Sequence, residues 1–317
     1  MTTLDLVWPG HRELVGAFPA FEPRRDALSQ FRKALAEGFA QLVPSGPTAP
    51  VERLAPGANG APPVRLLVHR PPAAGSALPA ILYVHGGGMI AGTADMMAGA
   101  SGQLAERTGA VVVAVDYRLA PETPFPGGLE DCYAALNWLR AEANELGVDP
   151  GRIAIMGDSG GGGLAAATAL LARDRGGPGI RAQILLYPML DDRTGSDRAR
   201  VNNPVTGEFV WTREQNCFAW DCVSGEASAS SALRDYLAPA RSPDVSGLPP
   251  TFLLVGGLDL FFEEDLAYTS RLSRAGVPID LSVYAGGVHG FDRLPGDIGE
   301  RALAETVAVI QRHLRAA

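Results

Sequence analysis

The sequence predicts an α/β fold built on a doubly wound, mostly parallel sheet. Short apolar runs rich in β-branched residues alternate with helical segments over most of the 317 residues. Several of these runs are apolar at every position, as strands must be when helices cover both faces of a sheet. This alternation is typical of α/β proteins whose strands lie parallel.

The expected elements follow one another in a regular order. Residues 1 to about 45 carry large apolar side chains three to four positions apart, which predicts amphipathic helices. A stretch rich in Pro, Gly and Ala, Pro44–Pro63, then breaks the pattern. The predicted strands are Val64–His69, Ile81–His85, Val111–Tyr117, Ile153–Met156, Ile184–Tyr187, Phe252–Val255 and Ile279–Tyr284. The predicted helices between them are Met97–Arg107, Leu129–Leu146, Leu164–Ala172, Glu263–Arg274 and Glu300–Leu314.

One segment, residues 192 to about 235, interrupts the alternation. It has no strand-like run and holds Trp211 and Trp220, two of the four tryptophans. Thr212, followed three residues later by Gln215, is a capping-box signature and predicts the start of a helix. An ordinary surface insertion would fit this segment. We favour a lid that covers a site together with the N-terminal helices, because exposed aromatic side chains need a surface to pack on.

Composition excludes several classes of protein. A chain with 46% hydrophobic residues is not disordered. The net charge is −8, with acids and bases interleaved, so we expect no nucleic-acid partner. Lys33 is the only lysine in the sequence, which excludes a P-loop. The purest apolar run, Ala110–Val115, is far shorter than the ~20 residues of a membrane span.

Cysteine usage and the N-terminus point to a reducing compartment. Cys132, Cys217 and Cys222 are too few for a disulfide scaffold, and we expect buried thiols. Asp5 and Glu13 lie where a signal peptide would carry positive charge. These features predict a soluble, cytoplasmic protein. The sequence shows no cluster of ligand residues, so neither a metal nor an organic cofactor is expected.

The strongest chemical signal is the segment Gly157–Gly161, which reads Gly-Asp-Ser-Gly-Gly. It follows one predicted strand and precedes the helix expected from Leu164. Serine on such a strand-to-helix turn sits in a strained conformation that small neighbours permit, and the helix directs its positive end at the hydroxyl. A plain glycine-rich turn would account for this pentapeptide if it stood alone.

Three further segments favour chemistry over a plain turn. His85–Gly88, with three glycines, directly follows a predicted strand and leaves backbone N–H groups free to face a ligand oxygen. Asp259 comes just after the strand Phe252–Val255, and His289 just after the strand Ile279–Tyr284. Because loops after the carboxyl ends of parallel strands lie along one edge of the sheet, all four segments should meet there.

Together the four segments resemble the carboxylesterases of the α/β-hydrolase superfamily, in the bacterial branch similar to mammalian hormone-sensitive lipase (family IV). The order Ser, Asp, His is that of the superfamily. The run Asp116–Glu122, which reads Asp-Tyr-Arg-Leu-Ala-Pro-Glu, is typical of this branch. The resemblance covers residues from about 64 to the C-terminus. It implies a serine esterase that hydrolyses short- to medium-chain carboxylic esters through an acyl-enzyme, with no cofactor.

The resemblance also implies a role for particular residues. Ser159 would be the nucleophile, His289 the general base and Asp259 the acid that orients the imidazole. The oxyanion hole would be formed by the backbone N–H groups of Gly87, Gly88 and Gly160.

The resemblance divides the chain into a cap and a catalytic domain. Residues 1–45 and 192–235 would form a helical cap, and residues 46–191 and 236–317 the α/β-hydrolase domain. Phe218 and Trp220 are candidates for aromatic walls of the substrate pocket.

Two positions depart from the family's usual pattern. Gly160 stands where alanine is usual, which would hold an oxyanion donor less rigidly. Leu260 stands where proline often follows the catalytic aspartate. Glu263 and Glu264 follow closely and are alternative acids for the triad.

Other interpretations account for fewer of these residues. Gly-Asp-Ser-Gly-Gly also occurs in trypsin-like proteases, with His85, Asp116 and Ser159 in order, but those proteins are all-β and usually disulfide-bonded. Gly161-x-Gly163-x-x-Ala166 could pass for a dinucleotide fingerprint, which leaves Ser159 without a role. A non-catalytic receptor on the hydrolase fold, such as the plant gibberellin receptor, is a third alternative. The expected partner is a small-molecule ester, and the sequence leaves open whether two copies of the chain form a homodimer.

Overall fold

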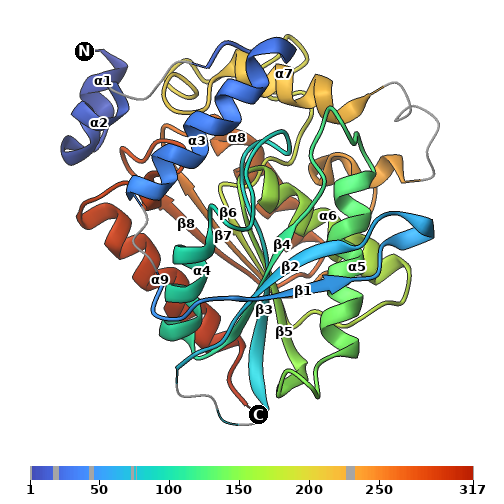
Figure 1. The fold of residues 1–317 in the computed structure, drawn as a ribbon. Helices are drawn as coiled ribbons and strands as arrows, with labels where there is room; N and C mark the ends of the chain where they lie inside the picture. The colour runs from blue at the N-terminus through green and yellow to red at the C-terminus, as the bar shows by residue number, and fades with distance from the viewer. Residues whose placement is uncertain are drawn as a thin grey trace.

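The computed structural model describes residues 2–16, 21–42, 46–72, 75, 77–225 and 233–316. Within them a single eight-stranded sheet runs through the molecule in the order β1-β2-β4-β3-β5-β6-β7-β8 (Figure 1). The strands are Val51–Ala55 (β1), Val64–His69 (β2), Leu78–Val84 (β3), Val111–Asp116 (β4), Val148–Asp158 (β5), Ala182–Leu186 (β6), Thr251–Gly256 (β7) and Ile279–Tyr284 (β8).

The prediction of a mostly parallel sheet is confirmed. β2 pairs antiparallel with both β1 and β4, and the strands from β4 to β8 pair parallel throughout. The central strands β3 to β7 are buried along nearly their whole length, as their continuous apolar runs require.

The stretch Pro44–Pro63, predicted to break the helical pattern, also contains a strand that the sequence did not predict. β1 lies inside this stretch, at the edge of the sheet, and four of its five residues are exposed. An exposed edge strand is held by its backbone pairing with β2, so it needs no apolar alternation that the sequence could display.

Helices cover both faces of the sheet. The long ones are Leu28–Leu42 (α3), Ala98–Thr108 (α4), Gly127–Ala141 (α5), Gly160–Asp174 (α6), Arg213–Ser224 (α7), Phe262–Arg274 (α8) and Asp297–His313 (α9), after the short helices Thr3–Leu6 (α1) and Arg12–Gly16 (α2). α4 and α9 pack together on one face, and α5 and α6 on the other (Figure 1). Short 3₁₀ turns are Pro9–His11 (η1), Arg25–Ala27 (η2), Ala58–Gly60 (η3), Arg234–Tyr236 (η5), Pro239–Arg241 (η6) and Phe291–Arg293 (η7).

The capping box at Thr212 is confirmed and starts α7. The Gln215 N–H donates to Thr212 Oγ1 at 3.3 Å, and the Thr212 N–H donates back to Gln215 Oε1 at 2.9 Å. The other described residues of the insertion form turns, bends and irregular loop, with η5 at its end, and residues 226–232 lie outside the described part. The prediction of helices in residues 1 to about 45 is confirmed for the described residues. Residues 17–20, which include the apolar Phe18, and residues 43–45 lie outside the described part.

The N-terminal segment and the insertion meet at the end of the sheet where the parallel strands finish (Figure 1). Phe21 stacks on Phe31 of α3 at 4.0 Å between ring centroids, and it meets Phe218 of α7 edge-on at 5.9 Å. Arg32 anchors α3 to the loops beneath it, donating to the carbonyls of Ile90 and Ala120. Both segments therefore cover the edge of the sheet where the functional loops were expected.

Candidate active site

Ser159 occupies a strained turn between β5 and α6. Its φ is 55° and its ψ is −124°, in a region that residues with a side chain rarely adopt. Three backbone hydrogen bonds hold it there. The Ser159 N–H donates to the Leu186 carbonyl, and its own carbonyl accepts from Gly163 and Met189. Because the turn itself caps the helix, α6 begins at Gly160 and not at Leu164 as expected.

The register of the parallel strands brings the four functional loops level with one another. Val84 at the end of β3 pairs with Gly157 of β5, and Gly256 at the end of β7 pairs with Tyr284 of β8. Each loop therefore leaves the sheet from the same edge, which is the geometric basis for bringing distant residues together.

Ser159, His289 and Asp259 form a continuous chain of hydrogen bonds. His289 Nε2 lies 2.8 Å from Ser159 Oγ, and His289 Nδ1 lies 2.9 Å from Asp259 Oδ2. Asp259 is fully buried, and its Oδ1 accepts from the Phe261 N–H at 2.9 Å. Ser159 and His289 are 5% and 8% exposed, so both are shielded but within reach of a ligand. A hydroxyl, an imidazole and a carboxylate in this arrangement can activate an oxygen nucleophile.

Aromatic rings enclose His289 on several sides. Tyr187 and Phe261 meet the imidazole edge-on, at 4.9 and 5.2 Å between ring centroids, and Trp211 lies at 6.3 Å. The sequence predicted a place in the site for none of the three. Tyr187 was visible as the last residue of a predicted strand and Phe261 as a near neighbour of Asp259, whereas nothing in the sequence distinguished Trp211 from Trp220.

The glycine-rich loop after β3 presents free backbone donors beside Ser159. Gly87 has a φ of 113°, and a Cβ there would lie 2.2 Å from the Ala91 carbonyl oxygen, so only glycine fits. The N–H groups of Gly87, Gly88 and Gly160 donate to no acceptor within the described residues. Unpaired N–H groups at one place can hold a developing negative charge on a substrate oxygen.

His85 shapes this loop without reaching the triad. Its ring is buried, stacks on Tyr117 at 4.2 Å between ring centroids, and places Nδ1 2.8 Å from the Gly86 carbonyl oxygen. Burial lowers the pKa of His85 below its ordinary value, so the ring is neutral near pH 7. The Tyr117 hydroxyl donates to the His85 carbonyl at 2.9 Å and fixes the loop from below. This contact and the α/β fold exclude the trypsin-like arrangement of His85 with Asp116 and Ser159.

The structure gives a steric reason for Gly160. A Cβ at this position would lie 2.7 Å from the Met89 backbone nitrogen and 2.9 Å from Gly88 Cα. The sequence suggested that glycine would loosen this donor, but the backbone of the glycine-rich loop packs directly onto it. Glycine at 160 therefore permits a closer approach of the two backbone segments than alanine would.

Replacing Gly160 by alanine should lower kcat by about ten- to a hundredfold. The methyl group would push the Gly88–Met89 backbone away, and losing one oxyanion donor completely costs on the order of 10²–10³ in turnover. Gly179→Ala is the matched control, because a Cβ at Gly179 meets no atom within 4 Å. Steady-state kinetics on an aryl ester would measure the effect, and unchanged turnover in Gly160→Ala would show that the loop tolerates the shift.

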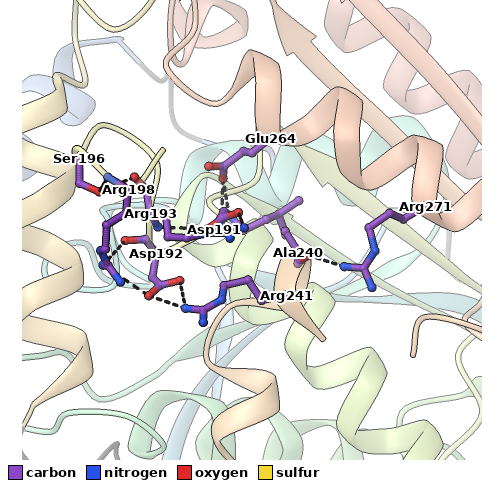
Figure 2. Close-up of polar contacts among 10 residues, drawn as sticks. Asp191, Asp192, Arg193, Ser196, Arg198, Ala240, Arg241, Glu264 and Arg271 are labelled. Atoms are coloured by element: carbon purple, nitrogen blue, oxygen red, sulfur yellow. Dashed lines mark hydrogen bonds and ion pairs between the residues drawn. The ribbon is translucent and has the colours of Figure 1, made fainter. Parts of the chain in front are cut away.

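The two alternative acids are engaged elsewhere. Glu263 Oε1 accepts from Asn203 Nδ2 at 2.9 Å. Glu264 is buried, and its Oε1 accepts from the N–H groups of Leu190 at 2.6 Å and Asp191 at 3.2 Å (Figure 2). Neither glutamate is bonded to His289, whose Nδ1 faces Asp259.

Glu264 belongs to a set of contacts that ties both ends of the insertion to α8 (Figure 2). Asp192, at the start of the insertion, pairs with Arg241, which follows the end of the insertion, at 2.6 Å. Asp192 also pairs with Arg198 at 3.7 Å. Arg271 of α8 donates to the carbonyl of Ala240. Because α8 starts immediately after the Asp259 turn, the insertion is anchored to the same helix that follows the acid.

Asp265 is a buried carboxyl without a hydrogen-bond partner among the described residues. It is fully buried on α8, next to Glu264 and near Asp259. Burial raises the pKa of Asp265 well above its ordinary value, and the charges of Glu264 and Asp259 raise it further. The side chain is therefore held in its neutral form over a wider pH range than an exposed aspartate.

Asp265→Asn should become progressively more stable than the wild type as the pH rises above 4. A carboxyl whose pKa is raised in the folded state contributes stability below its unfolded pKa and loses it as the pH rises through the folded pKa. The difference should reach the ~1–3 kcal/mol typical of an unpaired buried polar group. Urea unfolding from pH 4 to pH 8 measures it. A difference that is constant with pH would mean that Asp265 does not titrate in this range.

The predicted pocket residues lie on α7, at different depths. Trp220 is 3% exposed and packs in the core, and Phe218 is half-buried against Phe21. Trp211, at the start of the same region, packs on the glycine-rich loop, since a Cβ at Gly88 would lie 2.5 Å from its ring. Pocket walls formed by Phe218 and Trp220 stay a prediction.

The described residues contain no metal site and no membrane-spanning helix. Among them, no three His, Cys, Asp or Glu side chains lie where they could share a metal ion. None of the described helices combines the length and apolar character that crossing a bilayer demands. Cys132, Cys217 and Cys222 are all free thiols, two buried and Cys217 half-buried.

Comparisons with known proteins agree with this geometry. Residues 81–293 match the family described as alpha/beta hydrolase fold. A carboxylesterase, NlhH of Mycobacterium tuberculosis (strain CDC 1551 / Oshkosh), is 38% identical over 247 residues, which cover 77% of this chain and 76% of that protein. An ethyl acetate hydrolase of Pseudomonas putida is 34% identical over 258 residues, covering 80% of this chain and 79% of the relative.

Solved structures give the same result. A bacterial heroin esterase has a TM-score of 0.89 at 35% identity, over 99% of this chain and 100% of that chain. A hyperthermophilic esterase from the archaeon Pyrobaculum calidifontis has a TM-score of 0.86 at 33% identity, over 96% of this chain and 98% of that chain. The chain therefore belongs to the α/β-hydrolase family, and its resemblance to the hormone-sensitive-lipase-like carboxylesterases is confirmed.

Proposed function

We propose that the protein is a serine carboxylesterase that hydrolyses short- to medium-chain carboxylic esters through an acyl-enzyme. The observation that carries the proposal is the hydrogen-bonded chain from Ser159 through His289 to Asp259, at a strained serine beside free backbone donors. The carboxylesterase and ethyl acetate hydrolase named above support the substrate class.

In this proposal His289 is the general base. It takes the proton from Ser159 Oγ as that oxygen attacks the ester carbonyl carbon. The carbonyl oxygen becomes negative and is stabilised by the N–H groups of Gly87, Gly88 and Gly160. Asp259 fixes the proton on Nδ1 and stabilises the imidazolium.

The tetrahedral intermediate then collapses. The bond to the leaving alkoxide breaks, His289 gives its proton to that oxygen, and an acyl group remains on Ser159. A water molecule repeats the attack with His289 again as base, releasing the carboxylic acid and restoring the Ser159 hydroxyl. Each step moves one proton through Nε2, and none needs a cofactor.

We also propose that residues 1–45 and 192–235 act as the helical cap of a catalytic domain formed by 46–191 and 236–317. Two contacts support this division. Phe21 against Phe218 joins the N-terminal segment to the insertion, and Trp211 against Gly88 seats the insertion on the glycine-rich loop of the catalytic domain. In the proposal Phe218 and Trp220 contribute to a wall that favours short acyl chains. Cytoplasmic localisation and a homodimer are further expectations to be tested by fractionation and by sedimentation.

A rate series over aryl esters of increasing acyl length, with the matching anilide included, tests the function. We expect kcat/KM to be highest for short to medium chains and the anilide to be turned over much more slowly. A preference for the anilide would indicate an amidase instead. Saturable binding of the esters with no turnover would indicate a receptor on the same fold.

A further inference from the structure

A second set of buried polar side chains lies beside the triad and shares none of its hydrogen bonds. It is formed by Tyr83 on β3, Asp158 at the end of β5, Tyr187 after β6, and Asp292 and Arg293 on η7. The first three residues are 2–6% exposed, and the side chains of Asp292 and Arg293 are 8% and 16% exposed. Charged groups this deep require a partner or a function.

We call these five residues the buried relay, and their contacts join all five side chains. The Tyr83 hydroxyl donates to Asp158, and the Tyr187 hydroxyl donates to Asp292 Oδ1 at 2.6 Å. The Arg293 guanidinium lies between the two carboxylates, 3.3 Å from Asp292 Oδ2 and 3.9 Å from Asp158 Oδ1. One cation therefore serves two carboxylates.

The relay connects the two reacting segments by a route outside the triad. Asp158 directly precedes Ser159, and Asp292 follows His289 within one short turn in which the Arg293 N–H donates to the Gly290 carbonyl. The Tyr187 ring, held by its hydroxyl on Asp292, lies edge-on to the imidazole at 4.9 Å between centroids. These contacts therefore brace the turn that follows His289 and the ring that lies against its imidazole.

The relay also places charged groups behind the residues that contact His289. The groups facing the imidazole are Ser159, Asp259 and the rings of Tyr187, Phe261 and Trp211. Behind them, Asp158 precedes Ser159 in the sequence, and Asp292 is bonded to the Tyr187 hydroxyl. Arg293 pairs with both of these carboxylates, and Asp265 lies near Asp259. In a site with little water, a carboxylate favours the imidazolium that forms during catalysis, and a guanidinium opposes it.

We propose that Tyr187, Asp292 and Arg293 are positioning residues that hold His289 against Ser159 and set the charge at its imidazole. The inference rests on the proposed function, in which His289 is the general base. It assigns to the relay a role that packing alone would not give: its charges act on the imidazolium that forms during catalysis.

Opposite charge changes provide the test. Asp292→Asn removes a negative charge and should move the acid limb of the kcat/KM profile to lower pH. Arg293→Gln removes a positive charge and should move it to higher pH, each by about half a pH unit or more. The double variant should return the limb close to its original position, and Arg293→Lys, which keeps the charge, should leave it unmoved.

Tyr187→Phe keeps the test decisive if the charge variants do not fold. It retains the ring against His289 and removes the hydroxyl bond to Asp292, so kcat should fall about three- to tenfold with KM within twofold. Tyr236→Phe removes a comparable bond, 2.8 Å to Asp174 on the surface, and is the matched control. Glu130→Gln and Arg175→Gln, which break an ion pair of 2.7 Å between α5 and the end of α6, are the charge controls.

The proposal would be overturned if the acid limb of the kcat/KM profile stayed in place, or moved in the same direction, in both charge variants. An unchanged kcat in Tyr187→Phe would also overturn it. The proposed function fails separately. It is contradicted if the wild type does not hydrolyse esters or if removal of the Ser159 hydroxyl leaves hydrolysis intact.

Discussion

Ser159→Ala is expected to fold normally and to lose ester hydrolysis by a factor on the order of 10⁶ in kcat, as in other enzymes that lose the nucleophile of a triad. The Ser159 hydroxyl is the only nucleophile within hydrogen-bond distance of His289 in the described residues. Without it no acyl-enzyme forms, and the oxyanion donors alone give a small residual rate.

Burst and steady-state kinetics with an aryl ester would measure this loss. Ser101→Ala is the matched control, because Ser101 is also a buried serine, on α4, with a hydroxyl that makes no hydrogen bond within the described residues. We expect the Ser101 variant to retain turnover within about twofold, as substitutions remote from the site usually do. Hydrolysis that survives in Ser159→Ala would refute the assignment.

Asp259→Asn is expected to lower kcat by about 10⁴, the effect seen when the acid of a well-studied triad is replaced by its amide. The amide would present an N–H group to His289 Nδ1, where Asp259 Oδ2 now accepts at 2.9 Å. The imidazole would then carry its proton on Nε2 and could not accept the proton of Ser159.

Glu263→Gln and Glu264→Gln distinguish this role from that of the neighbouring acids. Glu263 contacts Asn203, and Glu264 holds the backbone of Leu190 and Asp191, so neither variant should lose more than a few-fold in kcat. Destabilisation of the Glu264 variant is expected and can be followed by its Tm. Near-normal turnover in Asp259→Asn, with loss of activity in either glutamate variant, would reassign the acid.

Much of the fold was predictable because burial leaves a pattern in the sequence. The central parallel strands are buried on both faces, and continuous apolar runs such as Val111–Val115 indicate this burial in the sequence. β1 was not predictable in this way, since Val51 and Leu54 face solvent and Glu52 and Arg53 lie between them. An exposed edge strand depends on the position of its neighbour, which sequence order alone does not give.

The reacting residues were predictable because chemistry restricts their types. A nucleophilic serine needs small neighbours on a strand-to-helix turn, and His289 and Asp259 follow strands that end at the same edge. The residues around them are set by packing in three dimensions. Trp211 contacts the glycine-rich loop through a fold of the insertion that no spacing encodes, and Gly160 reflects a backbone approach that only coordinates reveal.

The buried relay shows the same limit for charges. Asp158 precedes Ser159 in the sequence, but its ion-pair partner Arg293 comes from a distant part of the chain. Asp292 and Arg293 look like ordinary surface residues of a loop. Their partners Tyr187 and Asp158 follow or end other strands, so these contacts depend on how the sheet is assembled.

Covalent labelling of the serine tests the central claim most directly. A fluorophosphonate reacts with an activated serine, whose Oγ displaces fluoride and gains one phosphonyl group. We expect one equivalent per chain, located on Ser159 by peptide mass spectrometry, with hydrolytic activity falling in proportion to labelling. Complete labelling of Ser159 with full ester hydrolysis remaining, or inactivation by a label on another residue, would contradict the account.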